Sequence, residues 1–314
     1  MSEMWSRLKP RKLWRVVWRD LRQGSRERIE CGSCDSRHPR RVWWPIGGRL
    51  HGVRLRGLWY CKPECLQGAL AEVLGREQAG VRRETTVSHR FPLGLLLLSR
   101  QQLTAEQLRS ALERQHAAGE GRIGDWLLHL GFVSEAQITA AAARQWACPV
   151  LRHETASLGA GRFLPIPWSL LECFQMIPVE FAESTRTLLM AFSEGVDHTV
   201  LYALEQMLGY RTQACFVCPS ILQKGLQGLA GRDGTKDVVF DRLEDAGECA
   251  RVIASYAAKT GAEEVRLAQL GNQIWIRLEG EGRAGLNLVL RSPGTVGGKA
   301  AGMQPFRLAR GRAG

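Results

Sequence analysis

Two close pairs of cysteines are the clearest candidates for chemistry in this chain. Cys31 and Cys34 are separated by two residues, and Cys61 and Cys65 by three. Two such pairs with a strand-rich stretch between them are typical of tetrahedral zinc–thiolate sites. Four thiolates fill the coordination sphere of Zn²⁺ and leave no position open for a substrate. We therefore expect a structural metal site at these four cysteines.

The surroundings of the cysteines favour zinc over the alternative, which is four reduced thiols without a metal. A segment of this length that is rich in Arg and Gly (31–75) builds little core of its own. His38 and His51 are spare candidate ligands. We expect the first pair in a tight turn and the second pair at the start of a helix through Leu66 and Leu70. This layout is similar to a zinc ribbon or a treble clef.

Signatures of catalysis are weak in the rest of the chain. Residues 294–300 imitate a phosphate-binding loop, but the spacing is one residue short and Ala300 lacks the hydroxyl that binds Mg²⁺. Cys215 and Cys218 have redox-pair spacing, yet thiols buried at the end of a strand are the favoured interpretation. Because no local Ser/His/Asp grouping or carboxylate pair is found, we expect a protein without enzymatic activity.

A repeat with a period of thirty residues is the strongest structural signal. Residues 92–94 read Pro-Leu-Gly and residues 122–124 read Arg-Ile-Gly, and the later positions follow in the same frame. The shared frame is Leu93, Gly94, Leu97, Leu108, Ala111 and Gln115 in one copy and Ile123, Gly124, Leu127, Ile138, Ala141 and Gln145 in the other. Each copy predicts a short helix, a turn and a longer amphipathic helix. Thr or Ser with Gln three positions later (104–107 and 134–137) predicts a capping box at each long helix.

This repeat resembles the MshEN-type amino-terminal domain of the ATPases that drive type II secretion and type IV pilus assembly. The motif of that family runs Arg-Leu-Gly, a spaced Leu, a Gly, then Leu, Ala-Leu and Gln. The second copy matches it with Arg122 and Gly131 and has Ala142 where Leu is usual. The first copy has Pro92 in place of Arg and Gln101 in place of Gly. In those ATPases the domain docks the motor on a membrane-anchored partner.

The resemblance also implies a site for cyclic di-GMP, which two tandem copies bind in some members. Its residues here are Leu93, Gly94, Leu97, Gln115, Arg122, Ile123, Gly124, Leu127 and Gln145. The glycines let a phosphate approach a helix start, and Arg122 pairs with phosphate or guanine. Leu97 and Leu127 supply an apolar floor for the purines. The alternative is that the frame serves only to pack the helices, because the first copy lacks the arginine.

The segments after the repeat read as α/β structure. Expected strands are 148–151, 175–179, 187–192 and 212–217. Asp197 is expected to cap a helix over 198–208 that ends at Gly209, and Ser220 a helix over 221–229. Residues 236–290 weakly resemble the opening of the next domain of the secretion ATPases, with a helix near 248–260 and strands near 261–267 and 273–278.

The predicted organisation is a multidomain α+β chain. Its parts are a basic Trp- and Arg-rich segment (1–30), a small zinc-ribbon or treble-clef module (31–75), a linker (76–89), the tandem helical repeat with a small α/β subdomain (90–232), a partial ATPase-N2-like α/β segment (236–290) and a disordered tail (291–314).

Charge is concentrated at one end. Of the net charge of +12, residues 1–90 carry +11, from 20 Lys and Arg against 9 Asp and Glu. This asymmetry indicates a polyanion or an anionic membrane surface as the partner of that end. Leu13 and Val17, flanked by Trp14 and Trp18, fit an interfacial helix, and a nucleic-acid arm or an unstructured basic tail are the alternatives.

Composition and motifs together leave two main functions. The first is a non-catalytic cytoplasmic regulator or adaptor, peripheral to the inner membrane, that binds cyclic di-GMP and docks on a secretion or pilus partner. The alternative is a zinc-dependent nucleic-acid-binding protein that uses the basic N-terminal region, and a remnant of an ATPase without ligand is a third. The sequence has no apolar run of about eighteen residues, so we expect no spanning helix.

Overall fold

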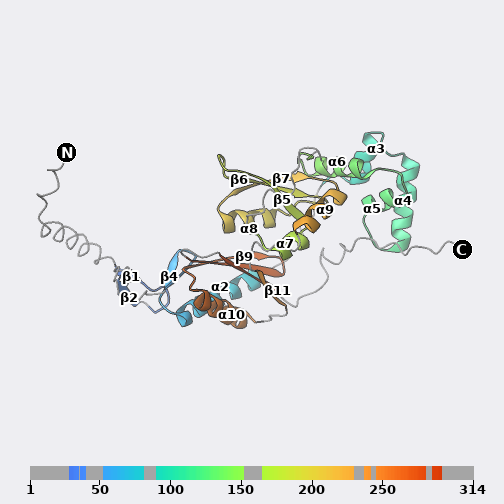
Figure 1. Ribbon diagram of the computed structural model, residues 1–314. Helices are drawn as coiled ribbons and strands as arrows, with labels where there is room; N and C mark the ends of the chain where they lie inside the picture. The colour runs from blue at the N-terminus through green and yellow to red at the C-terminus, as the bar shows by residue number, and fades with distance from the viewer. Residues whose placement is uncertain are drawn as a thin grey trace, which may run out of the picture. The chain divides into compact units, whose positions relative to one another are not determined.

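The computed structural model describes residues 28–34, 36–39, 52–80, 90–151, 165–229, 237–241, 245–280 and 285–291 (Figure 1). The chain divides into two compact units. The first comprises Met1–Val81, Leu243–Leu267 and Ile276–Leu288, and the second Arg82–Arg242, Ala268–Trp275 and Val289–Gly314. Both units contain helices and strands, so the predicted multidomain α+β class is confirmed.

Two short hairpins open the first unit. β1 (Arg28–Glu30) pairs antiparallel with β2 (Arg37–Pro39), and β3 (Val53–Leu55) with β4 (Leu58–Tyr60). The backbone N–H of Gly32, in the turn after β1, donates to the carbonyl oxygen of Trp59 at 2.9 Å. The first hairpin is therefore tied to the second through β4.

α2 (Pro63–Gly80) follows β4 and begins with a proline, whose missing N–H costs nothing in a first turn. It confirms the helix predicted through Leu66 and Leu70, and it continues into the segment predicted as a linker (76–89). Leu66, Leu70 and Leu74 recur at four-residue spacing and are buried. This spacing places them on one face of the helix.

A six-stranded sheet has the order β4-β3-β9-β10-β11-β8. Its remaining strands are β9 (Glu264–Leu270), β10 (Gln273–Glu279), β11 (Leu286–Arg291) and β8 (Asp237–Asp241). β3 runs parallel to β9, with Leu55 beside Val265. The sequence predicts β9 and β10, but it does not predict β8 or β11.

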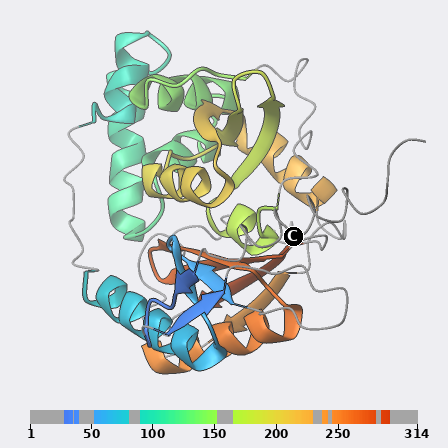
Figure 2. The same cartoon turned by 90° about the vertical axis from the view of Figure 1, so that its left-hand side faces the viewer.

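α2 and α10 (Ala246–Thr260) lie side by side on one face of this sheet (Figures 1 and 2). Leu70 of α2 and Ile253 of α10 are both fully buried. Asp245 caps α10 by accepting the N–H of Glu248 at 3.2 Å, and Gly261 ends the helix in the left-handed conformation. Segments that the sequence separates as 31–75 and 236–290 thus share one sheet and one helical layer.

The tandem repeat forms the four helices that its periodicity predicts. They are α3 (Leu93–Ser99), α4 (Ala105–Ala118), α5 (Ile123–His129) and α6 (Glu135–Gln145). Both predicted capping boxes are present: Thr104 with Gln107 begins α4, and Ser134 with Gln137 begins α6. The short helix of each copy packs on the long helix of the other, α3 on α6 and α5 on α4. Leu97 and Leu127 are fully buried between them.

The turn after each short helix explains one difference between the copies. Gln101 has φ of 57° and Gly131, thirty residues later, has φ of 67°. A left-handed residue is needed there because the N–H groups of Gln102 and Phe132 return to the carbonyls of Leu97 and Leu127, each at 3.0 Å. Glycine takes this conformation without strain, and the first copy holds a glutamine in it.

The α/β part of the second unit follows the repeat. Its elements are α7 (Trp168–Cys173), β5 (Met176–Ala182), β6 (Thr187–Phe192), α8 (His198–Leu208), β7 (Arg211–Phe216) and α9 (Pro219–Leu229). β6 lies between antiparallel β5 and parallel β7. Phe192 and Phe216, paired at the ends of β6 and β7, are buried in the core.

Local signals in this part are confirmed with two exceptions. Asp197 caps α8 by accepting the N–H of Thr199 at 3.0 Å, and Gly209 ends the helix. The predicted strand 148–151 is reduced to one bridge between Val150 and Phe216. The prediction that Ser220 caps a helix from residue 221 is wrong, because α9 begins at Pro219 and includes Ser220 in its first turn.

Several predictions fall on residues that the structure does not describe. These are the basic segment up to residue 27, His51, the rest of the linker (81–89), the loop-like residues 294–300 and the tail from 292. Among the described helices, none combines the length and the apolar character that crossing a membrane requires.

Candidate functional site

A reciprocal pair of hydrogen bonds closes the repeat. Gln115 Nε2, near the end of α4, donates to the carbonyl oxygen of Gly121 at 2.8 Å, just before the second copy. Gln145 Nε2, at the end of α6, donates to the carbonyl oxygen of Phe91 at 2.8 Å, just before the first copy. Phe91 and Gly121 occupy equivalent positions, as do the two glutamines. Because each copy makes the same contact to the other, the repeat has pseudo-two-fold symmetry.

The motif glycines face the inside of the repeat. A Cβ on Gly94 would lie 2.7 Å from Leu108 Cδ1, so a side chain there would force Leu108 to shift. A Cβ on Gly124 would lie 3.3 Å from Leu93 Cδ2 and 3.6 Å from Ile138 Cγ2. Both glycines therefore allow the helices to pack closely. Their predicted role in letting a phosphate approach stays a prediction.

The apolar residues of the predicted ligand site divide between core and surface. Leu97 and Leu127 are fully buried, and Ile123 is half-buried beside them. Leu93 is half-buried against Gly124. The apolar side chains that reach the surface next to the first motif are instead Phe91 and Leu95, which are 58% and 44% exposed. Leu97 and Leu127 therefore belong to the core, and their predicted contact with purines stays a prediction.

Arg122 stands at the N-cap position of α5 and is half-exposed. Its Nη2 lies 2.8 Å from Oε1 of Glu194, just after β6, and its Nε lies 3.6 Å from Oδ2 of Asp125. Burial raises the pKa of Glu194 above its usual range, although Arg122 acts in the opposite direction. The second copy therefore presents a guanidinium that an internal carboxylate already holds.

The first copy has no arginine at the equivalent N-cap position, which Pro92 occupies. Arg90 lies two residues earlier, and its guanidinium carbon is 3.0 Å from the centroid of a Trp146 ring. Trp146 in turn packs on the backbone of Gly195, where a Cβ would lie 3.0 Å from Trp146 Cζ2. A cation thus lies near the start of each copy, and an intramolecular partner holds each one.

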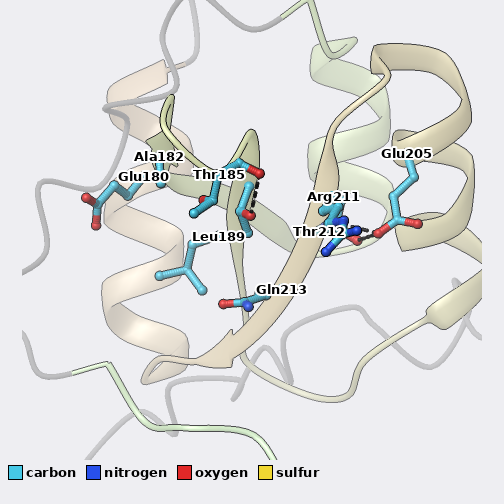
Figure 3. Close-up of a pocket in the computed structure, with 9 residues that line it drawn as sticks. Glu180, Ala182, Thr185, Leu189, Glu205, Arg211, Thr212 and Gln213 are labelled. Atoms are coloured by element: carbon cyan, nitrogen blue, oxygen red, sulfur yellow. Dashed lines mark hydrogen bonds between the residues drawn. The ribbon is translucent and has the colours of Figure 1, made fainter.

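Two hollows in the described part of this unit can be compared with the predicted ligand residues. The larger, of about 650 Å³, opens over the three-stranded sheet and contains none of the predicted ligand residues. Figure 3 shows Leu189 and Gln213 on neighbouring strands of its floor and Glu205 bound to Thr212 at its side. The smaller, of about 530 Å³, lies at the end of α4 and is lined by Gln115, His116 and Glu120 among others. Of these two hollows, the second is the one that touches the repeat motif.

The four predicted metal ligands come together. Cys31 and Cys34 lie in or beside the turn after β1, Cys61 directly follows β4, and Cys65 lies in the first turn of α2. Their four Sγ atoms all lie within 4.8 Å of one another, with Cys34–Cys61 at 3.6 Å and Cys61–Cys65 at 3.9 Å. A tetrahedral site with Zn–S distances of about 2.3 Å separates its sulfurs by about 3.8 Å. The cluster therefore fits zinc.

The thiols of this cluster differ in acidity. Burial raises the pKa of Cys31, but hydrogen bonds from the backbone at Cys34, Cys61 and Ser33 outweigh that effect and bring it to about 6. Burial and the neighbouring sulfurs raise the pKa of Cys61 to about 12. A divalent cation would remove the repulsion between the thiolates, so metal binding is expected to release protons.

Two other candidates for chemistry do not join a site. His38, predicted as a spare ligand, lies outside the clustered donors and packs edge-on against Trp59, with ring centroids 5.2 Å apart. Burial raises the pKa of Cys215 to about 12, so its thiol stays protonated at neutral pH. The interpretation of Cys215 as a buried strand thiol agrees with this environment.

Sequence reasoning missed two carboxylates that fasten the repeat to the α/β part of the same unit. One is Glu194, the partner of Arg122. The other is Glu135, whose oxygens accept the backbone N–H and the hydroxyl of Ser220, each at 2.7 Å. The carboxylate of Glu135, on α6, thus accepts hydrogen bonds from the first turn of α9, where a negative charge is favourable. A single acidic residue far away in the chain leaves no local signal, so neither contact was predictable.

Known proteins offer similarity to part of this chain. A structure of MshE with cdg is 27% identical and covers 45% of this chain and 99% of that one, with a TM-score of 0.38. Two crystal structures of the N-terminal domain of XpsE are 18% and 21% identical. They cover 43% and 42% of this chain and 91% and 89% of their own, with TM-scores of 0.34 and 0.26.

No family model and no curated protein matches the sequence.

Proposed function

We propose that this chain is a non-catalytic regulatory adaptor whose repeat binds a cyclic dinucleotide, and that the ligand is cyclic di-GMP. The observation that carries the proposal is the reciprocal bonding of Gln115 and Gln145. It relates the starts of the two copies by a pseudo-two-fold axis, and a cyclic dinucleotide has two-fold symmetry of its own. A symmetric ligand can thereby meet equivalent backbone at both motif starts.

The two copies contribute unequally to this ligand. Arg122 supplies a guanidinium that pairs with a phosphate or with a guanine edge. Pro92 supplies none, so Arg90 takes that part after it leaves Trp146. Exposed Phe91 and Leu95 offer apolar contact to a base beside the first motif. The ligand is expected to rest mainly on the second copy.

The cysteine cluster is proposed to hold Zn²⁺ in a structural role. Cys31, Cys34, Cys61 and Cys65 would complete a tetrahedral site and fix the β1–β2 hairpin to the corner between β4 and α2. When bound, the ion replaces shared protons with a fixed positive charge. Its role is to stabilise this corner.

The adaptor role rests on the family resemblance. We propose that the repeat domain docks on a protein of the secretion or pilus machinery, in the cytoplasm at the inner membrane. The basic residues 1–90 would then meet anionic lipid. The second candidate is binding of nucleic acid through the same basic end. The charge of +11 on residues 1–90 favours nucleic acid as much as anionic lipid. Retention of the full chain on DNA that falls steeply with salt, without retention on anionic vesicles, would select the second candidate.

Calorimetric titration of cyclic di-GMP into the full chain tests the ligand proposal. We expect saturable binding of one ligand per chain, lost in Arg122→Ala. Arg144→Ala is the matched control, because it removes an exposed arginine from the end of α6 and leaves the motif unchanged. Equal binding by all three proteins, or no saturable heat in the unaltered chain, would refute the proposal.

A further inference from the structure

The environment of Arg122 distinguishes the second copy from a simple anion site. About half of the Arg122 side chain is exposed, and its N–H groups form a planar fork suited to a phosphate. One arm of that fork already lies 2.8 Å from Oε1 of Glu194. The more distant Asp125 lies 3.6 Å from Nε and is itself more than half-exposed. Glu194 is therefore the anion that an incoming phosphate meets.

Glu194 occupies a place where a carboxylate is costly. Its side chain is 29% exposed, and it follows directly on the buried end of β6, after Phe192 and Ser193. Burial raises the pKa of its carboxyl even though Arg122 is in contact with it. Arg122 opposes this shift and the nearby Asp125 adds to it. Separating the Glu194 carboxylate from Arg122 therefore costs free energy, and an incoming phosphate has to exceed that cost.

The loop that carries Glu194 also contacts the other end of the second copy. Gly195 lies under Trp146, and the ring of His198, at the start of α8, is 6.0 Å from a Trp146 ring. Trp146 is the residue on which Arg90 stacks. The loop between β6 and α8 therefore contains the partner of Arg122, which is Glu194. It also contacts Trp146, the partner of Arg90.

We propose that Glu194 is an internal competitor for the anionic ligand: its carboxylate occupies the guanidinium of Arg122, and a phosphate of the ligand displaces it on binding. This inference rests on the proposed function, because it concerns the same ligand. It assigns to Glu194 a role in setting affinity, although Glu194 lies outside the repeat motif. The competition weakens the unaltered site and links its occupancy to the β6–α8 loop.

The test is calorimetric titration of cyclic di-GMP into the full chain and two Glu194 variants. Glu194→Gln keeps the size and a hydrogen bond but removes the charge, and we expect binding tighter by about five- to tenfold. Glu194→Asp keeps the charge on a shorter side chain, and we expect a smaller gain. The Asp variant keeps the proposal testable if Glu194→Gln does not fold, which thermal melting establishes beforehand.

A matched control separates local competition from overall charge. Glu183→Gln makes the same change at an exposed carboxylate in the turn between β5 and β6, and its affinity should equal that of the unaltered chain. Tighter binding by the Glu194 variants, without tighter binding by Glu183→Gln, supports the competition.

The opposing outcomes differ for the two claims. If the unaltered chain binds through Arg122 and both Glu194 variants bind equally well or more weakly, the competition is overturned and the proposed function stands. If neither the unaltered chain nor Glu194→Gln shows saturable binding, the proposed function and the competition both fall.

Discussion

The cysteine cluster and the helical repeat hold their backbones in different ways. The cluster joins the ends of two three-residue strands, β1 and β4, to the start of α2 through four thiols, with the hydrogen bond from Gly32 to Trp59 beside them. The repeat encloses fully buried Leu97 and Leu127 and caps its own helices. On the proposed zinc site, the first region depends on an ion, whereas the second is held by its own side chains. The comparison predicts that each can be broken without the other.

Removing the metal should produce the largest effect. Chelation, or Cys65→Ser, is expected to abolish binding of about one zinc per chain and the exchange protection of the Gly32 amide. The repeat should keep its protection, because its capping boxes and buried leucines do not involve the cluster. Zinc analysis with hydrogen exchange measures both. Loss of protection throughout α2 as well would contradict the view that packing with α10 holds that helix.

Truncation of a buried leucine should affect the repeat next most strongly. Leu127→Ala removes a fully buried side chain and is expected to lower the free energy of unfolding of the second unit by about 3–5 kcal/mol. Leu128→Ala, at a neighbouring position that is 43% exposed, should cost far less. Denaturant titration gives both values. Zinc content should stay unchanged in both variants, and a fall in it would break the separation of the two regions.

The contact between α6 and α9 should contribute less to the free energy of unfolding than the buried leucine does. Glu135→Ala removes a carboxylate that accepts two hydrogen bonds from Ser220, and about 1.5–3 kcal/mol of stability should go with it. Glu106→Ala removes an exposed carboxylate from the first turn of α4, so it reports the helix-dipole effect alone. Similar losses in the two variants, measured by thermal and denaturant unfolding, would show that the Ser220 contact adds nothing.

The smallest expected change is an increase in stability. Gln101 holds a left-handed conformation that Gly131 holds in the other copy. Gln101→Gly should therefore relieve strain and raise stability by about 0.5–1 kcal/mol, and Gly131→Ala should lower it by a similar amount. Opposite signs in the two copies would show that the turn needs the same backbone in both. A loss in both variants would mean that Gln101 makes a contribution beyond its conformation.

Local patterns account for most of what could be predicted. The period of thirty, the capping boxes, Asp197 and Gly209 act within one or two turns of a helix, so the sequence carries them openly. The cysteine cluster was predictable because its ligands come in close pairs.

Long-range pairings could not be predicted in this way. The parallel pairing of β3 with β9 joins Leu55 to Val265, and the packing of α2 on α10 spans a similar separation. Glu135 and Glu194 act through single contacts across the second unit, and any acidic residue on a surface looks the same in sequence. The motif glycines were predictable as special positions, yet their inward direction emerged only from the helix packing.

One titration tests the central claim, that a single ligand bridges the two copies. The indole N–H signals of Trp126 and Trp146 report on the two motif starts. Trp126 Nε1 donates to the backbone carbonyl oxygen of Glu120, and the guanidinium of Arg90 stacks on Trp146. Both signals should shift with the same midpoint and saturate at one cyclic di-GMP per chain in a heteronuclear NMR titration. Two separate midpoints, or no shift at either tryptophan, would contradict the account.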